Sequence, residues 1–278
     1  MSTDPPTWQV LGRTAKPARK RINQDCYGWR ALPGGAGIAM AVADGHGSAG
    51  HPRSDTGAQL AVAAFLDAAV ALGASLELDL SPEQAKIRAE EYLPGDLVRD
   101  WRKRAEDDLA ENPMGEDERD LEATPVLYGT TLIGAMITGQ LVLGWQIGDG
   151  DLCLLAADGQ VSTPLRYPLE NLGDETDSLC SDDAQRLVHT HCAWSPGAEP
   201  PALVVLSTDG LSKSFDSFDG YLDFVCGVYQ RIARDGEGKV GEDMQGWLEQ
   251  ASSYSGDDTT LVAAWPDRRS AGPEGQSP

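Results

Sequence analysis

Short apolar runs, each bounded by glycine or by an Asp-Gly pair, recur along the chain and predict buried β-strands. They occupy residues 37–42, 129–138, 140–147, 151–157, 202–207 and 259–265. The three runs between residues 129 and 157 are separated only by Gly-Gln and Gly-Asp-Gly turns, so the pattern predicts one antiparallel meander. Another plausible strand begins at Asp25.

Helical patterns lie between the apolar runs, at 56–72, 81–109, 218–234 and 241–253. The first is rich in alanine and leucine and follows Ser54 and Asp55, either of which can cap its N-terminus. Pro94 and Gly95 interrupt the second pattern, so we expect a break there. Because strands come in runs rather than in regular alternation with helices, the predicted fold class is α+β.

The domain organisation is expected to be simple. No internal repeat or low-complexity linker divides the sequence, which predicts a single domain over residues 1–266. Residues 165–200 are polar and lack periodicity, so we interpret them as a flap-like insertion within that domain. The tail at 267–278 is expected to be disordered.

The charge balance argues against several classes of partner. The chain carries 44 acidic and 22 basic residues, a formal net charge of -22, which opposes the phosphate contacts that nucleic-acid binding depends on. Nucleic acid and anionic membrane surfaces are therefore not expected as partners. Most of the carboxylates are explained as solvated surface, so only those in special positions carry information about chemistry.

The N-terminal segment and the cysteines indicate a compartment. Residues 1–21 contain neither the apolar core of a signal peptide nor the roughly 18 apolar residues of a membrane span. The five cysteines are scattered and include no C-x-x-C pair that would suggest zinc or redox chemistry. Reduced thiols in a cytoplasm fit this usage best, so we expect a cytoplasmic protein.

Three aspartates share one local setting, in which a predicted strand meets a turn: Asp44 in VADGHG, Asp209 in STDGLS and Asp257 in SGDDTT. A side chain at a strand end beside glycine is held by the sheet but open to a ligand. Taken singly, an Asp-Gly pair is more often a turn signal than a ligand. Gathered together with Asp25, however, four carboxylates would repel one another unless a divalent cation neutralised them. Oxygen ligands favour Mg²⁺ or Mn²⁺ over zinc.

Six short motifs occur in an order and at a spacing typical of one enzyme family, each at the start or end of a predicted strand. They are NQD at 23–25, VADGHG at 42–47, GTT at 129–131, IGDG at 147–150, STDG at 207–210 and GDDTT at 256–260. Through these motifs the chain resembles the protein phosphatase 2C family over nearly its whole length. The resemblance implies a central β-sandwich of two antiparallel sheets flanked by helices, with a dinuclear metal site at one end.

The resemblance also assigns roles to residues. It implies two Mg²⁺ or Mn²⁺ ions held by Asp25, Asp44, the Gly45 carbonyl, Asp209 and Asp257. Asp44 would bridge both ions, and Asp25 would hold a water on one of them. Asp257 matches the family better than Asp258, because the ligand lies three residues before a threonine, here Thr260. Asp149 in IGDG matches the family's weaker ligand for a third ion.

His46 in DGHG matches the family's general acid, which protonates the departing alkoxide, although the tetrapeptide alone fits a locally bonded turn residue equally well. Two positions depart from the family pattern. Many members have a phosphate-binding arginine where this chain has Lys20, so Lys20, Arg21 and Arg53 all stay open as the phosphate ligand. The family's GDSR reads Gly-Asp-Gly-Asp at 148–151, which exchanges a basic side chain for an acidic one.

The sequence thus predicts a metal-dependent phosphoprotein phosphatase that hydrolyses phosphoserine or phosphothreonine by attack of a metal-activated water. Its expected partners are a phosphorylated protein substrate and a cognate Ser/Thr kinase in a signalling pathway. Two alternatives stay open. One is a phosphatase-fold binding or regulatory protein with little turnover, and the other is a hydrolase of a small phosphorylated metabolite.

Overall fold

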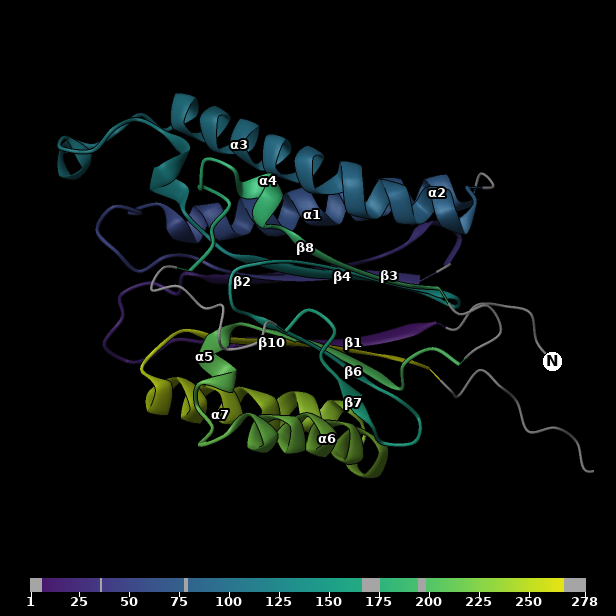
Figure 1. The fold of residues 1–278 in the computed structure, drawn as a ribbon. Helices are drawn as coiled ribbons and strands as arrows, with labels where there is room; N and C mark the ends of the chain where they lie inside the picture. The colour runs from purple at the N-terminus through teal and green to yellow at the C-terminus, as the bar shows by residue number, and fades with distance from the viewer. Residues whose placement is uncertain (1–6, 36, 78–79, 167–175, 195–198, 268–278) are drawn as a thin grey trace, which may run out of the picture.

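Two antiparallel β-sheets stacked face to face form the centre of the computed structural model, which describes residues 7–35, 37–77, 80–166, 176–194 and 199–267 (Figure 1). The first sheet has the order β1-β10-β9-β6-β7, with the bounds Trp8–Ala15, Thr259–Pro266, Leu203–Ser207, Asp151–Leu155 and Val161–Ser162. The second has the order β2-β3-β4-β5-β8, with the bounds Asp25–Ala31, Gly37–Asp44, Leu132–Thr138, Leu141–Ile147 and His189–Trp194. The predicted α+β sandwich of two antiparallel sheets is confirmed.

Helices cover both outer faces of the sandwich (Figure 1). Over the second sheet lie α1 (Ser54–Glu77), α2 (Pro82–Ile87), the π-helical turn η2 (Arg88–Tyr92), α3 (Leu93–Glu111) and the short α4 (Ala184–Leu187). Over the first sheet lie α5 (Asp209–Ser212), α6 (Phe218–Asp235) and α7 (Glu237–Ser255). Within the described ranges, three 3-10 turns occur in connections, at Pro33–Gly35, Glu116–Glu118 and Pro125–Tyr128.

Strand β3 shows how the sequence builds these layers, because it is buried along nearly its whole length. Ile38, Met40 and Val42 belong to the core between the sheets, where they pack with Val204 and Val262 of the first sheet. The intervening residues are all alanine and belong to the core beneath α1. Since side chains alternate along a strand, bulky residues fill the space between the sheets and small residues allow the helix to approach closely.

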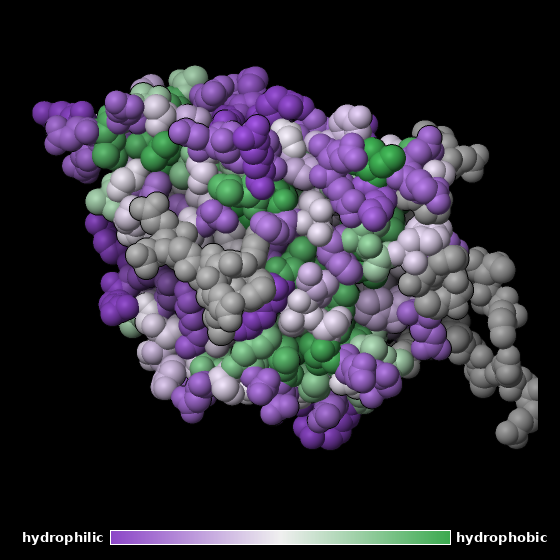
Figure 2. Space-filling view, in the orientation of Figure 1, coloured by the Kyte–Doolittle hydropathy of each residue, from purple (hydrophilic) through white to green (hydrophobic). Residues whose placement is uncertain are grey.

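Helix α1 is the one described helix whose length and hydropathy would suit a membrane span, over Ser54–Leu76. It lies between the second sheet and α3 (Figure 1), and 44% of its most apolar 18-residue segment is buried within the protein. Its apolar composition is therefore explained by packing on two sides. On the face shown in Figure 2, hydrophilic side chains gather over α3, which lies outside α1.

The prediction of one meander between residues 129 and 157 is wrong. β4 pairs with β5 in the second sheet, but β6 crosses to the first sheet and lies between β9 and β7. The Gly-Asp-Gly turn makes this crossing: Gly148 has a φ of 99°, and a Cβ on Gly150 would lie 2.9 Å from the Ser207 carbonyl oxygen. Glycines that resemble a hairpin turn in sequence therefore carry the chain from one sheet to the other.

Other segments differ locally from the prediction. β1, which the apolar pattern did not predict, is mostly half-buried and pairs with β10 along its whole length. Within the predicted flap at 165–200, His189–Trp194 form β8, the edge strand that pairs with β5. Residues 167–175 and 195–198 of that range, and 268–278 of the predicted tail, lie outside the described residues.

The helical pattern at 81–109 is irregular, but not at the expected place. Pro94 lies in the first turn of α3, where proline is tolerated, and α3 continues through Gly95. The irregular segment is η2, the π-helical turn between α2 and α3. The Trp145 indole N–H donates to the Ala89 carbonyl within it (2.8 Å), which ties this turn to β5.

Trp101→Ala is expected to lower the free energy of unfolding by about 3–5 kcal/mol. Trp101 on α3 is fully buried, and its indole N–H donates to the Gly57 carbonyl of α1 (3.0 Å). Urea denaturation followed by far-UV circular dichroism measures the change. Trp29→Ala is the matched control, since Trp29 is 42% exposed and a loss of about 1 kcal/mol or less is expected there. Equal losses in the two variants would contradict this packing.

Candidate metal centre

The four strand-end aspartates come from both sheets, two from each. In the second sheet, Asp25 begins β2 and lies directly opposite Asp44, the last residue of β3. Beside the first sheet, Asp209 begins α5 two residues after β9 ends, and Asp257 lies two residues before the neighbouring strand β10. Carboxylate oxygens of Asp44, Asp209 and Asp257 lie within 4.8 Å of one another. The two sheets therefore deliver an acidic cluster to one end of the sandwich.

Asp25 is held in place by two threonines of the opposite sheet. Its Oδ2 accepts hydrogen bonds from the hydroxyls of Thr208 (2.8 Å) and Thr260 (2.6 Å). Its Oδ1 is buried and has no hydrogen-bond partner in the described part of the chain. An unpartnered buried carboxylate oxygen is costly, so this atom fits a ligand for a cation.

Burial and neighbouring negative charges raise the pKa values of three of the four aspartates, Asp25, Asp44 and Asp209. Burial, followed by the charges of the other three aspartates, raises the pKa of Asp44 well above its ordinary range. Burial raises the pKa of Asp25 to about 7 in spite of its two hydrogen bonds. Burial and the neighbouring charge of Asp149 raise the pKa of Asp209 to about 6. A divalent cation would relieve this repulsion, and the carboxylate donor set suits Mg²⁺ or Mn²⁺.

The backbone around Asp44 is fixed by the GTT motif. The Asp44 N–H donates to Thr131 Oγ1 (3.0 Å), and the Asp44 carbonyl accepts from Thr130 Oγ1 (2.9 Å). A Cβ on Gly45 would lie 2.5 Å from the Ser54 carbonyl oxygen, so position 45 requires glycine and can act only through its backbone. The sequence contains the GTT motif, but the hydrogen bonds of its two threonines are visible only in the fold.

The adjacent Asp257 and Asp258 have different surroundings. Asp257 belongs to the cluster of three carboxylates. Asp258 is fully buried, and its Oδ2 accepts from the Gln24 N–H (2.9 Å) and from Lys20 Nζ (3.0 Å). Lys20 Nζ also donates to Asp257 Oδ1 (2.5 Å). Burial raises the pKa of Asp257, but the hydrogen bond and the charge of Lys20 outweigh burial, and this pKa lies below its ordinary value.

The loop that carries His46 is held by Gln24, another residue whose role the sequence did not reveal. The Gln24 side-chain amide donates to the His46 carbonyl (3.0 Å) and to Ser54 Oγ (2.7 Å). The His46 and His51 ring centroids are 5.0 Å apart. Burial and the charge of His51 lower the pKa of His46 to about 4, so the ring is neutral near pH 7.

The three candidate phosphate ligands have unequal surroundings. Lys20 contacts Asp257 of the cluster, whereas Arg21 is exposed. The Arg53 guanidinium donates to both carboxylate oxygens of Glu118 (2.7 Å each) and to the Tyr128 hydroxyl (2.9 Å). Arg53 thus links the segment after α3 to the start of α1. Because these bonds occupy its guanidinium, Arg53 is the least available of the three candidates to bind a phosphate.

A family model described as Protein phosphatase 2C matches residues 14–250. The chain belongs to the protein phosphatase 2C family. No curated protein sequence matches it.

Solved phosphatases share this fold. The catalytic domain of the serine/threonine phosphatase PstP in complex with two manganese ions has 18% identity and a TM-score of 0.56, with 93% of this chain and 97% of that chain covered. Stp1 from Staphylococcus aureus has 16% identity and a TM-score of 0.57, with coverages of 93% and 94%. A bacterial serine phosphatase has 15% identity and a TM-score of 0.59, with coverages of 93% and 98%. At such low identities these structures establish the phosphatase 2C fold and leave the activity to be argued from the site.

In the phosphatase 2C motif IGDG, Asp149 lies beside the cluster rather than within the group of three carboxylates. Its Oδ2 accepts from Lys213 Nζ (3.2 Å), and the same ammonium contacts Asp209 Oδ2. Asp151, which stands where the family motif has a basic residue, is buried at the start of β6 opposite Ser207. The departure from GDSR therefore changes the charges next to Asp149.

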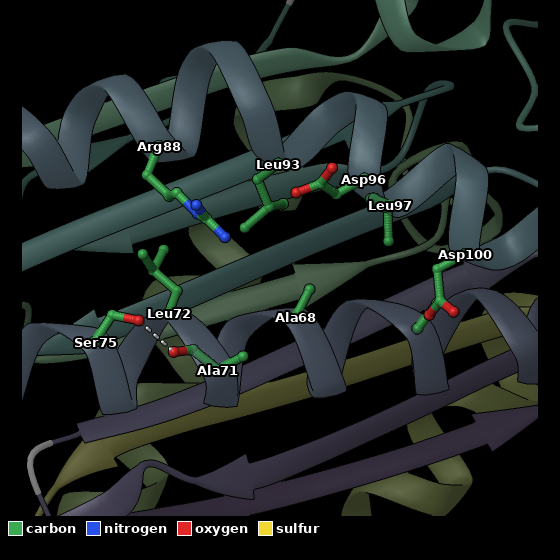
Figure 3. A pocket seen from close by; sticks show the side chains of 10 residues that line it. Ala68, Ala71, Leu72, Ser75, Arg88, Leu93, Asp96, Leu97 and Asp100 are labelled. Carbon is green, nitrogen blue, oxygen red and sulfur yellow. Dashed lines mark hydrogen bonds between the residues drawn. The ribbon is translucent and has the colours of Figure 1, made fainter.

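A separate groove of about 250 Å³ lies between α1 and α3 (Figure 3). Leu72, Leu93 and Leu97 supply much of its apolar lining, and Arg88 and Asp100 supply charge. No clustered aspartate lines this groove, so we assign it no part in the candidate metal centre.

The raised carboxyl pKa values predict how the metal-free protein responds to pH. A carboxyl group whose pKa is higher in the folded than in the unfolded state stabilises the fold below its unfolded pKa of about 4. That contribution is lost as the pH rises through the folded pKa, about 7 for Asp25. In EDTA, Asp25→Asn should therefore raise Tm relative to the unmodified chain at about pH 8 and have little effect near pH 4. Thermal melts across this range measure the difference, and a difference independent of pH would contradict the electrostatics of this cluster.

Proposed function

We propose that this phosphatase 2C protein is a metal-dependent phosphoprotein phosphatase that hydrolyses phosphoserine and phosphothreonine. The observation that carries the proposal is the group of three carboxylates within 4.8 Å at the end of a phosphatase 2C sandwich. The buried oxygens of Asp25 and Asp209 that have no hydrogen-bond partner among the described residues support it, because a cation would satisfy them.

Asp25, Asp44, Asp209 and Asp257, with the Gly45 carbonyl, would hold two Mg²⁺ or Mn²⁺ ions. When bound, such a pair of ions activates a water and stabilises the attacking and leaving oxygens of a phosphoester. Asp44 is suited to bridge the ions because it pairs with Asp25 in the sheet and lies within 4.8 Å of the other two carboxylates. Thr208 and Thr260 would orient Asp25, so that its free oxygen faces the reacting groups.

Lys20 would bind the phosphate of the substrate. Its ammonium contacts Asp257, and 24% of its side chain is exposed, so it can meet both the cluster and a ligand that enters from solvent. A lysine acts as a point charge and lacks the two-pronged geometry of arginine, which predicts weaker phosphate binding than in relatives with arginine there.

His46 would donate a proton to the departing alkoxide of the serine or threonine. Its pKa of about 4 leaves the ring neutral near pH 7. A bound phosphate dianion would raise that pKa, because a nearby negative charge favours the imidazolium form. General acid catalysis by His46 would therefore begin only once the substrate is bound.

The substrate would be a phosphorylated protein, modified by a Ser/Thr kinase of the same signalling pathway, in a cytoplasmic setting. With Mn²⁺, the purified chain is expected to release phosphate from phosphoserine and phosphothreonine peptides. Asp44→Asn should reduce kcat by about 100-fold or more, because several kcal/mol of charge stabilisation would be lost. Asp243→Asn, which alters an exposed carboxylate of α7, is the matched control and should leave kcat unchanged.

The same assay separates the alternatives. Bound Mn²⁺ without any phosphate release would favour a binding protein of this fold. Faster release from sugar phosphates than from phosphopeptides would favour a hydrolase of small metabolites. Equal activity in Asp44→Asn and the unmodified chain would rule out the proposed site.

Lys20→Met is expected to raise KM for a phosphopeptide by about tenfold or more at saturating Mn²⁺, because a charged hydrogen bond contributes about 1.5 kcal/mol or more. Lys20→Arg should keep KM near or below its original value. Arg21→Met is the matched control, since Arg21 is the exposed neighbour. Steady-state kinetics decide the assignment: an increase in KM for Arg21→Met and none for Lys20→Met would reverse it.

A further inference from the structure

Lys213 places a positive charge against two aspartates at the rim of the metal centre. It follows α5 directly, and its N–H donates to the Asp209 carbonyl (2.8 Å), so one helical turn brings its side chain back over Asp209. Its ammonium contacts Asp209 Oδ2 and lies 3.2 Å from Asp149 Oδ2. The Lys213 ammonium therefore bridges Asp209, a proposed metal ligand, and Asp149 of the IGDG turn.

The two oxygens of Asp209 have different surroundings. Lys213 contacts Oδ2, whereas Oδ1 is buried and has no hydrogen-bond partner in the described residues. The Asp209 side chain is 9% exposed and that of Asp149 is 24% exposed, whereas the Lys213 side chain is 62% exposed, so the lysine reaches the two aspartates from the solvent side. Lys213 thus binds Oδ2 of Asp209, and Oδ1 remains available to a ligand at the cluster.

The charges around the IGDG turn are consistent with this arrangement. Position 151, basic in the family motif, is Asp151 here. Burial raises the pKa of this carboxyl group, and the charges of Arg166 and, to a smaller extent, Lys213 lower it. The positive charge beside Asp149 is therefore supplied from the end of α5 instead of from β6.

We propose that the Lys213 ammonium occupies the place where Asp149 and Asp209 would otherwise bind a third divalent cation, so that this centre uses two metal ions and one tethered charge. An ammonium has three donors and no acceptor, so it cannot ligate a metal. Its charge also repels any cation brought to the same two oxygens. The proposal rests on the two-metal function argued above and extends it to the adjoining pair of aspartates.

Mn²⁺ binding to the full chain tests the proposal without measuring activity. Free Mn²⁺ is followed by its electron paramagnetic resonance spectrum during titration of the unmodified chain, Lys213→Met and Lys239→Met. Lys239 is the matched control, because it is an exposed lysine paired with an aspartate four residues away. Lys213→Met should bind one more ion per chain than the other two proteins, and Asp149→Asn in the Lys213→Met background should abolish that extra ion. Equal numbers of ions in all three proteins would overturn the proposal.

A second arm needs no change at Lys213 and decides the matter if Lys213→Met does not fold. Asp149→Asn alone should leave the number of Mn²⁺ ions bound by the chain unchanged, because Lys213 already neutralises that carboxylate. A decrease by one ion would overturn the proposal while leaving the two-metal function intact. Absence of all Mn²⁺ binding by the unmodified chain would instead overturn the proposed function, and the proposal about Lys213 with it.

Discussion

The whole site depends on one electrostatic constraint: the sandwich holds four carboxylates together, and burial and neighbouring negative charges raise the free energy of ionising three of them, Asp25, Asp44 and Asp209. The constraint begins with the register of β2 and β3, which sets Asp25 directly opposite Asp44. Residues opposite each other in an antiparallel pair are only about 4.5–5.5 Å apart at their Cα atoms. The adjacent strands β9 and β10 of the other sheet add Asp209 and Asp257. Bringing a cation to this place is the simplest way to stabilise the ionised form.

Uncharged threonine hydroxyls bind the aspartates at the centre of the cluster, and two lysine ammonium groups lie at its edge. Threonine hydroxyls position Asp25 from the opposite sheet and fix the turn after β3, so the carboxylates are oriented without being neutralised. Lys20 and Lys213 each contact one clustered aspartate and one aspartate outside the cluster, Asp258 and Asp149 respectively. Lys20 therefore occupies one carboxylate oxygen of Asp257, and Lys213 occupies one of Asp209. The two lysines limit which oxygens of these aspartates are open to a metal.

Much of the fold was predictable because its signals are local. The buried strands β3 and β9 are continuous apolar runs, and the aspartates at their ends stand beside glycine, so both could be identified from neighbouring residues alone. The role of Thr208 could not, because its partner Asp25 lies 183 residues away in sequence. The path of β6 could not be predicted either, because a Gly-Asp-Gly turn has the same composition whether the chain reverses within one sheet or crosses to the other. The Lys213 contact with Asp149 likewise depends on that crossing.

Each sheet supplies two of the four aspartates, so the centre lies across the seam between two layers. An ion bound there would join Asp44 of one layer to Asp209 and Asp257 of the other, and its binding free energy would add to the stability of the packed sandwich. A chain with only one sheet formed would present two of the four proposed ligands and would lack the site proposed for the two ions. Under the proposed function, incompletely folded chains would therefore be inactive, and phosphate release would require that the two sheets have packed against each other.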